Sequence, residues 1–263
     1  MTKAADLCLS FFMTSPSDCG YLAQRKARAI VVDPDHPKDA PLYGLLSQIG
    51  FRRNGATIYR PHCDDCRACI PVRIPVDEFR PSRSQRRVRA ANRDLSLRIL
   101  APTFDDGHFA LYKKYLRARH PKSEMNEASA SDYQAFLFSP WCDSLLFEYS
   151  IDDRLIAVAV IDRLPNALSC VYTFFDPEHG HRSPGSKAIL QAIEYARGSN
   201  RRWVYLGYYI PDSTSMRYKG NWHPQERLIE GRWRRFEKGS TAAMIRSPAR
   251  TGMGKAGDRA MDM

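Results

Sequence analysis

Three apolar segments that follow one another closely constrain the fold of this chain most strongly. SLLFEYS (144–150), RLIAVAVIDRL (154–164) and ALSCVYTFFDP (167–177) are rich in β-branched and aromatic residues, a composition typical of strands. Asp152-Asp153 and Pro165-Asn166 separate them and are typical turn residues. Because strands joined by such short turns pair antiparallel, the sequence predicts a meander here.

A helix and a further strand are predicted after the meander. In SKAILQAIEYARG (186–198) the apolar residues recur with the period of a helix, and Gly198 marks its end. The stretch WVYLGYYI (203–210) reads as a strand. This succession predicts an α/β layer with one β-α-β crossover. The helix residues expected to face the sheet are Ala188, Ile189, Ala192, Ile193 and Ala196.

The remaining segments have weaker patterns. Residues 1–80 are irregular and predict only a helix at 42–51 and short strands at 56–61 and 69–76. Two amphipathic helices are predicted later, at 106–121 and at 129–138, the second with Ser129 or Ser131 as its N-cap. We expect three parts: a cysteine- and arginine-rich N-terminal region (1–95), a second domain (96–236) and a disordered tail (237–263).

The excess of positive charge indicates a polyanionic partner. The chain has 40 Lys and Arg against 29 Asp and Glu, a formal net charge of +11. Nucleic acid is the commonest partner of such a protein. Six arginines fall between Arg80 and Arg93, with no acidic residue until Asp94. The run is either a solvated face or a phosphate-binding surface, and the candidates for phosphate contacts are Arg80, Arg83, Arg86 and Arg87.

The sequence gives no sign of a membrane partner. No apolar run approaches the ~18 residues that a membrane span needs. The apolar patch at 7–13 lacks a convincing cleavage site, so we expect mature sequence rather than a signal peptide there. The seven cysteines are an odd number in a chain of this size, which favours reduced thiols and a cytoplasmic location.

Three cysteines share a regular spacing in PHCDDCRACIPV. Cys63, Cys66 and Cys69 form Cys-x-x-Cys-x-x-Cys, the front of a ferredoxin-type cluster motif, and Cys19 could be a fourth ligand. Four thiolates would also suit zinc. Alternatively, the thiols pack as small apolar side chains. The sequence leaves these interpretations open.

The order of meander, loop, helix and strand resembles the GCN5-related acyltransferase fold. In that fold the loop before the helix follows R/Q-x-x-G-x-G/A, and its backbone holds the pyrophosphate of coenzyme A. This chain has Arg182 and Gly185 there, but Lys187 where glycine or alanine is expected. The departure disfavours a coenzyme A-dependent acetyltransferase, and we expect Arg182 and Lys187 to face tRNA instead.

Four segments carry a more specific resemblance. They are CGYL (19–22), the block from LYGLLSQIGF to SQRRV (42–88), TFFDP (173–177) and LGYYIPDSTSMRYKGNWHP (206–224). In this order they resemble the arginyl-tRNA–protein transferase family, and in particular its bacterial aspartate/glutamate leucyltransferase branch. Any one of these motifs alone would be weak evidence.

The resemblance implies transfer of leucine from leucyl-tRNA to proteins with N-terminal Asp or Glu, which marks them for N-degron proteolysis. The alternatives are arginyl transfer by the same fold and a non-enzymatic RNA-binding module. The transfer itself requires no cofactor. The family resemblance also implies a candidate iron–sulfur cluster with Cys19, Cys63, Cys66 and Cys69 as ligands.

Aminoacyl transfer needs the tRNA end and the acceptor held together, a proton taken from the amine, and the oxyanion stabilised. No nucleophile–base set stands out, so we expect direct attack by the amine. We expect catalytic roles for Asp176, Tyr208 and Lys219. Since a carboxylate is best bound by a charged donor, the candidates around the acceptor are Arg60, Arg217, Tyr218 and Lys219.

Overall fold

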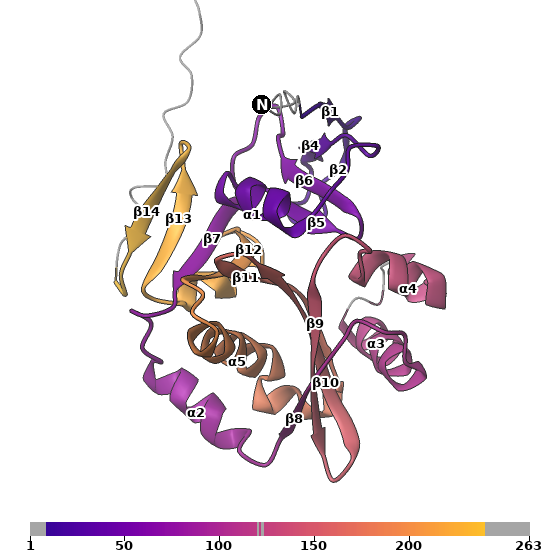
Figure 1. Cartoon of the computed structure of the whole chain (residues 1–263), viewed down its shortest axis with the longest axis vertical. Helices are drawn as coiled ribbons and strands as arrows, with labels where there is room; N and C mark the ends of the chain where they lie inside the picture. The colour runs from indigo at the N-terminus through magenta and orange to yellow at the C-terminus, as the bar shows by residue number, and fades with distance from the viewer. Residues whose placement is uncertain (1–8, 120, 122–123, 240–263) are drawn as a thin grey trace, which may run out of the picture.

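The central feature is a mixed sheet, seen in a computed structural model that describes residues 9–119, 121 and 124–239 (Figure 1). Within these residues the sheet has eight strands in the order β14-β13-β7-β12-β11-β10-β9-β8. Their bounds are β14 Arg232–Phe236, β13 Gln225–Ile229, β7 Ile70–Pro75, β12 Trp203–Tyr209, β11 Ala167–Phe175, β10 Arg154–Leu164, β9 Ser144–Ile151 and β8 Ser96–Leu100. The mixed α/β class expected from the sequence is confirmed.

The predicted meander is confirmed. β9, β10 and β11 pair antiparallel in sequence order, with Asp152 and Asp153 in the first turn at positive φ. β10 is buried almost throughout, because it lies between two strands and is covered on both faces. β8, which the sequence did not predict, pairs antiparallel with β9 and forms one edge of the sheet.

Helices cover the two faces of this sheet (Figure 1). α5 (Pro184–Gly198) packs against Ala157, Ala159 and Ile161 of β10. The alternate residues Val158 and Val160 pack against α3 (Asp106–Arg119) and α4 (Ala130–Leu137). Successive side chains of a strand point to opposite faces, so α5 lies on one face and α3 with α4 on the other. Ser129 is the N-cap of α4, one of the two serines expected.

The N-terminal part forms a second, smaller sheet. It has the order β1-β4-β6-β5 and packs with α1 (Ala40–Gln48), while β2 and β3 form a separate hairpin. The bounds are β1 Phe11–Met13, β2 Ser17–Asp18, β3 Lys26–Ala27, β4 Ala29–Val32, β5 Arg52–Asn54 and β6 Thr57–Pro61. β7 then enters the large sheet between β12 and β13, so residues from both expected parts share that sheet.

The arginine-rich run folds into a helix, α2 (Arg83–Ala91), which lies beside α5 (Figure 1). Ser82 and Gln85 form a capping box at its N-terminus, and Val88 packs against the core. Three short 3₁₀ helices complete the described chain: η1 Glu124–Glu127, η2 Pro177–Arg182 and η3 Arg217–Asn221. Of the expected tail, residues 240–263 lie outside the described residues, as do residues 1–8.

No helix in the described part of the chain is both long enough and apolar enough to cross a bilayer.

Candidate active site at the divergence of β11 and β12

Two neighbouring parallel strands separate in the middle of the large sheet. β11 and β12 pair only at Ala167–Trp203, Leu168–Val204 and Ser169–Tyr205, although each strand continues for several residues. On its other side β12 stays paired with β7, with a register shift between Tyr205 and Gly207. Diverging strands leave backbone groups without a sheet partner, and such groups need another donor or acceptor.

Arg52 of β5 reaches into this divergence. Its Nη2 atom donates to the carbonyl oxygen of Cys170, at 2.5 Å, one residue beyond the last β11–β12 pair. The residue is 8% exposed, and its Nη1 atom is buried without a hydrogen-bond partner in the described chain. A guanidinium nitrogen that is buried and unpaired is unfavourable in the free protein and suits a site that an anion occupies.

Lys219 of η3 also lies next to Gly207. A Cβ atom placed on Gly207 would lie 3.4 Å from Lys219 Nζ and 3.7 Å from Arg52 Nε, so both side chains face this glycine. Lys219 is 6% exposed, and within the described residues no carboxylate lies within ion-pair distance of it. Burial, and next the positive charge of Arg52, lower the pKa of Lys219 to about 7. A large share of Nζ is therefore uncharged near neutral pH and can accept a proton.

Tyrosines surround the two basic side chains. The Tyr208 hydroxyl donates to the carbonyl oxygen of Gly50, at 3.0 Å, and the Tyr59 ring lies edge-on to the Tyr208 ring. Burial raises the pKa of Tyr208 and of Tyr59, so both hydroxyls stay protonated. Tyr218, next to Lys219, is 44% exposed as a whole residue. Its hydroxyl group is nevertheless surrounded by protein, and this burial raises the pKa of Tyr218.

Asp176, expected to be catalytic, lies in a network of ion pairs instead of beside Lys219. Its carboxylate is 2.8 Å from Lys114 Nζ and 3.0 Å from Arg154 Nη2, and it also accepts from the backbone N–H of Glu178 at the start of η2. Burial raises its pKa, but these hydrogen bonds outweigh burial and lower the pKa overall. A carboxylate with a lowered pKa is a weak base, and these contacts hold Asp176 at the start of η2.

The two arginines expected at the acceptor lie at the margin of the site. Arg60 of β6 donates to the carbonyl oxygen of Ile49, and its guanidinium lies 5.0 Å from the centre of the Phe51 ring. Arg217 is exposed at the first residue of η3, two residues before Lys219. The structure thus brings Lys219, Tyr208 and Tyr218 around Arg52, and leaves Arg60 and Arg217 further out.

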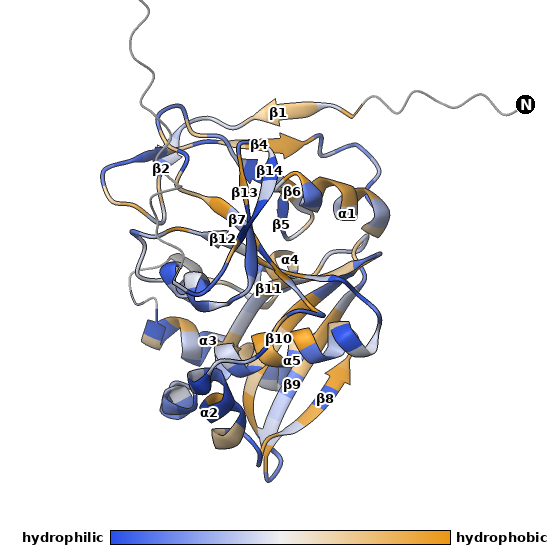
Figure 2. Ribbon diagram, turned by 90° about the vertical axis from the view of Figure 1, so that its left-hand side faces the viewer, coloured by the Kyte–Doolittle hydropathy of each residue, from blue (hydrophilic) through white to orange (hydrophobic). Residues whose placement is uncertain are grey.

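The arginines expected to contact tRNA share an exposed face of α2. Arg83, Arg86 and Arg87 are exposed and are spaced three and four residues apart, so they project from one side of the helix. None of the three forms an ion pair within the described chain. Figure 2 shows α2 as predominantly hydrophilic. Arg80 precedes the helix and donates to the carbonyl oxygens of Asp77 and Phe79.

Arg182 and Lys187, expected in the phosphate loop, already have protein partners. Arg182 donates to both carboxylate oxygens of Asp94 and to the carbonyl oxygen of Ala91. Lys187 Nζ donates to Gln191, and burial lowers its pKa. The Arg182 contacts tie the end of η2, just before α5, to the end of α2.

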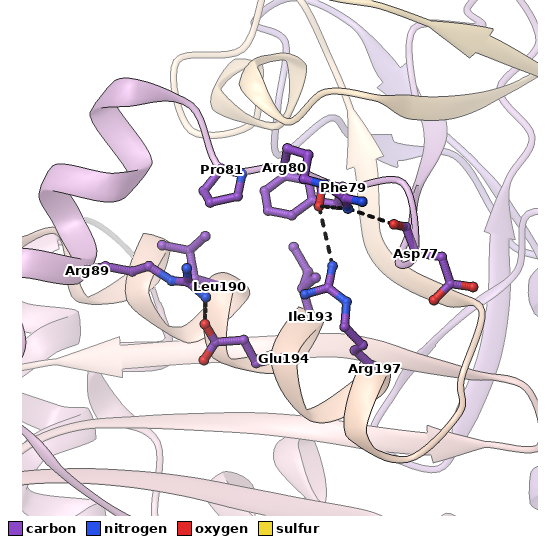
Figure 3. A pocket seen from close by; sticks show the side chains of 9 residues that line it. All are labelled: Asp77, Phe79, Arg80, Pro81, Arg89, Leu190, Ile193, Glu194 and Arg197. Atoms are coloured by element: carbon purple, nitrogen blue, oxygen red, sulfur yellow. Dashed lines mark hydrogen bonds and ion pairs between the residues drawn. The ribbon is translucent and has the colours of Figure 1, made fainter.

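A pocket of about 460 Å³ lies between α2 and α5, apart from Arg52 and Lys219 (Figure 3). In Figure 3 Arg89 pairs with Glu194, and Arg197 donates to the carbonyl oxygen of Phe79. The basic side chains here are therefore satisfied within the protein. The pocket adjoins the exposed arginine face of α2.

The four cysteines are free thiols on neighbouring loops. Burial first, and then the nearby Cys63, Cys66 and Cys19 thiols, raise the pKa of Cys69 to about 12. The donor type thus suits zinc or an iron–sulfur cluster. However, in the part of the chain that the structure describes, no three His, Cys, Asp or Glu side chains converge closely enough to hold a metal. The thiols have the donor chemistry of such a site, but in this structure they are not assembled around one point.

The sequence analysis missed Arg52 and Gly207. The signal for Arg52 was the pair Arg52-Arg53 on a strand, since adjacent strand residues point to opposite faces and one arginine of such a pair must enter the interior. The signal for Gly207 was a glycine within a predicted strand, which indicates a bulge or a close approach.

Comparisons with known proteins assign the chain to a family. The family model described as "Arginine-tRNA-protein transferase, N terminus" matches residues 17–87, and the one described as "Arginine-tRNA-protein transferase, C terminus" matches residues 107–229. The aspartate/glutamate leucyltransferase of Pseudomonas fluorescens (strain Pf0-1) is 43% identical over 233 residues, which cover 89% of this chain and 98% of that protein.

A second bacterium has a similar relative. The aspartate/glutamate leucyltransferase of Chromobacterium violaceum is 42% identical over 231 residues, covering 88% of this chain and 96% of that protein. Among solved structures, FemX matches 76% of this chain and 79% of its own at 10% identity, with a TM-score of 0.45, which supports no conclusion about this chain. On the sequence matches, which extend over both halves, this chain belongs to the arginine-tRNA–protein transferase family.

Proposed function

We propose that this protein transfers leucine from leucyl-tRNA to the α-amine of proteins that begin with Asp or Glu. The observation that carries the proposal is the match to bacterial aspartate/glutamate leucyltransferases over nearly their whole length. In a cell, the added leucine would mark the acceptor for the N-degron pathway. A reaction between a tRNA and cytosolic proteins also agrees with the proposed cytoplasmic location.

The reaction converts an ester into an amide without ATP. The acceptor amine attacks the carbonyl carbon of the leucyl ester, a C–N bond forms, and the ribose oxygen leaves. The amine must lose one proton and the ribose oxygen must gain one. Uncharged Lys219 Nζ is suited to accept the first and return it as the second, because its pKa is about 7. Tyr208 and Tyr218, whose hydroxyls stay protonated, are suited to line the bound leucine and terminal adenine.

The exposed face of α2 is the proposed binding surface for the tRNA backbone. Arg83, Arg86 and Arg87 project into solvent and have no acidic partner among the described residues. Phosphate neutralisation by such side chains supplies most of the affinity of sequence-independent binding. Arg80 continues this surface toward the pocket between α2 and α5.

The finer fold assignment is also a proposal. The meander β9–β11, the crossover helix α5 and the divergence of β11 from β12 support a GCN5-related acyltransferase-like fold. In this arrangement the diverging strands would accept the two substrates from opposite sides and bring them together near Gly207.

Metal binding by Cys19, Cys63, Cys66 and Cys69 is a separate proposal, supported by the Cys-x-x-Cys-x-x-Cys spacing and by the thiol donors themselves. Protein purified without oxygen is expected to show visible absorption near ~400 nm if it holds an iron–sulfur cluster. Elemental analysis would identify zinc. A colourless, metal-free protein that transfers leucine at the full rate would contradict a required metal.

The central experiment is a transfer assay with purified protein. Peptides beginning with Asp, Glu or Asn are incubated with radiolabelled leucyl-tRNA or arginyl-tRNA, and the peptide-bound label is counted. We expect label from leucyl-tRNA on the Asp and Glu peptides and little on the Asn peptide. Label from arginyl-tRNA alone would instead assign the arginyl activity. If the peptides gain no residue from either tRNA, the proposed reaction is wrong.

A further inference from the structure

We infer that Arg52 is the specificity-determining residue of the site, and that its unpaired Nη1 atom binds the side-chain carboxylate of the acceptor's first residue, next to Lys219 Nζ. This inference rests on the proposed leucyl transfer and names the group that selects the acceptor. It assigns no covalent step to Arg52, which acts by binding.

The adjacent residue shows what a purely structural arginine looks like in this protein. Arg53 donates from Nε and Nη2 to the two oxygens of Asp162, each at 2.7 Å, and from Nη2 to the carbonyl oxygen of Leu137 at 2.9 Å. Arg52, by contrast, makes one hydrogen bond, to Cys170, and leaves a buried nitrogen unpaired. Both side chains are buried, but only Arg53 has an acidic partner within the described residues.

The acidic groups around Arg52 do not compensate its charge. Those within electrostatic range are the hydroxyls of Tyr43, Tyr59 and Tyr208 and the thiol of Cys170. Burial raises the pKa of Tyr43 and of Cys170 to about 12, and it raises the pKa of the other two as well. All four are neutral at pH 7. The site therefore has a net positive charge inside the protein, the condition that attracts an anion most strongly.

The burial of the two basic side chains favours a carboxylate over a tRNA phosphate. Arg52 and Lys219 are buried below the surface against a glycine, whereas the exposed arginines of α2 are open to a large polyanion. Distinguishing Asp from Asn, which have the same shape, requires a buried charge that the amide cannot satisfy. A guanidinium supplies this charge in a planar fork that matches a carboxylate.

The test compares two variants. Each removes one arginine whose guanidinium donates a hydrogen bond to a backbone carbonyl oxygen. R52Q removes the proposed receptor. R201Q removes Arg201, which donates to the carbonyl oxygen of Leu164 near the opposite end of β12. Affinity for the Asp and Asn peptides is measured by calorimetry without tRNA. Transfer is measured as kcat/KM at saturating leucyl-tRNA, and the dissociation constant of leucyl-tRNA is measured separately.

We expect R52Q to lower kcat/KM for the Asp peptide by about 100-fold or more and to bring the Asp/Asn ratio close to one. Its affinity for leucyl-tRNA should change less than about twofold. R201Q should keep the wild-type Asp/Asn ratio. R52K, which keeps the charge but loses the fork, should retain part of the preference and also covers the case in which R52Q folds poorly.

Two results would overturn the inference. One is an unchanged Asp/Asn ratio in R52Q. The other is loss of leucyl-tRNA affinity in R52Q with peptide affinity unchanged, which would place a tRNA phosphate at this site. Because peptide binding is measured without tRNA, it separates this inference from the proposed reaction. A wild-type protein that binds the Asp peptide but transfers nothing would contradict only the reaction.

Discussion

Arg53 and Asp162 form a two-point ion pair with both side chains fully buried, and the pair joins the small N-terminal sheet to the centre of the large one. Ser144 also donates to Asp162, at 2.7 Å, so the carboxylate is bound from three sides. β5 is thereby fixed relative to β10, and Arg52 on the opposite face of β5 is held against Cys170. The structural pair thus positions the residue that we place in the site.

Removing the acidic half of this pair should destabilise the protein strongly. D162A leaves Arg53 buried without its counter-charge, which typically costs about 3–5 kcal/mol. The matched control is D143A, because Asp143 pairs with Arg163 while both side chains are partly exposed. Such a surface pair contributes only about 0–1 kcal/mol. Urea unfolding at pH 7 measures both. Equal losses of stability in the two variants would contradict the role given to the buried pair.

The long, strongly patterned elements could be predicted from the sequence. β10, β11 and α5 were found because a strand covered on both faces, or a helix with one apolar face, carries a clear local signal. The strands β1–β6 are two to five residues long; β6 was expected, at 56–61, but the other five are too short for a period to show. The hairpin β13–β14 is rich in arginine and glutamate, which are not typical strand residues, so the sequence carries no clear strand signal there.

Pairing across the chain could not be predicted. The alternation of β7 identified it as a strand, but its neighbours β12 and β13 lie far along the sequence, and no local pattern names them. The same limit applies to the site. Arg52 and Arg53 look alike in the sequence, and they are distinguished only by Cys170 and Asp162, which lie 118 and 109 residues away. Lys219 was found because it belongs to a motif.

The lowered pKa of Lys219 predicts how stability depends on pH. Burial first, and the charge of Arg52 next, lower the pKa of Lys219 from about 10.5 in the unfolded chain to about 7 in the folded protein. Between these values the unfolded chain binds the additional proton, so this residue makes the free energy of unfolding rise with pH from about 7 upward. Below pH 7 Lys219 is protonated in both the folded and the unfolded state, so the full cost of burying its charge lowers the free energy of unfolding.

K219M removes this titration and fills the same space with an apolar side chain. We therefore expect K219M to be more stable than the wild type at pH 7, with the difference shrinking toward pH 9. Urea unfolding at several pH values measures it. A wild type and a K219M variant that differ by the same free energy at pH 7 and pH 9 would show that Lys219 has an ordinary pKa.

The exposed face of α2 predicts a salt-dependent loss of tRNA affinity. R83Q/R87Q removes two arginines spaced four residues apart. Each lost phosphate contact should reduce the slope of log K against log salt by about 0.7–0.9. The control is R117Q/R119Q, which removes two arginines from the last turn of α3. Filter binding of leucyl-tRNA at several salt concentrations distinguishes them. Identical slopes for both double variants would assign the tRNA surface elsewhere.

Substitution of Gly207 by alanine is expected to weaken binding of the acidic acceptor by more than backbone strain alone can explain. Its φ is 84°, a conformation that side chains disfavour, and an added methyl group would lie 3.4 Å from Lys219 Nζ and 3.7 Å from Arg52 Nε. Gly231 has a similar φ of 75°, but an added methyl group there meets nothing within 4 Å. G207A and G231A should therefore lose comparable stability, about 1–2 kcal/mol each.

Only G207A should weaken binding of the acidic acceptor, because its methyl group occupies the space between the two basic side chains where the carboxylate is expected. Calorimetry with the Asp peptide should show at least about a tenfold weaker affinity for G207A and an unchanged one for G231A, which corresponds to about 1.4 kcal/mol. Thermal unfolding of both variants provides the comparison of strain. If G207A binds the Asp peptide as tightly as G231A does, the carboxylate does not lie over Gly207, and the placement of the acceptor between Arg52 and Lys219 fails with it.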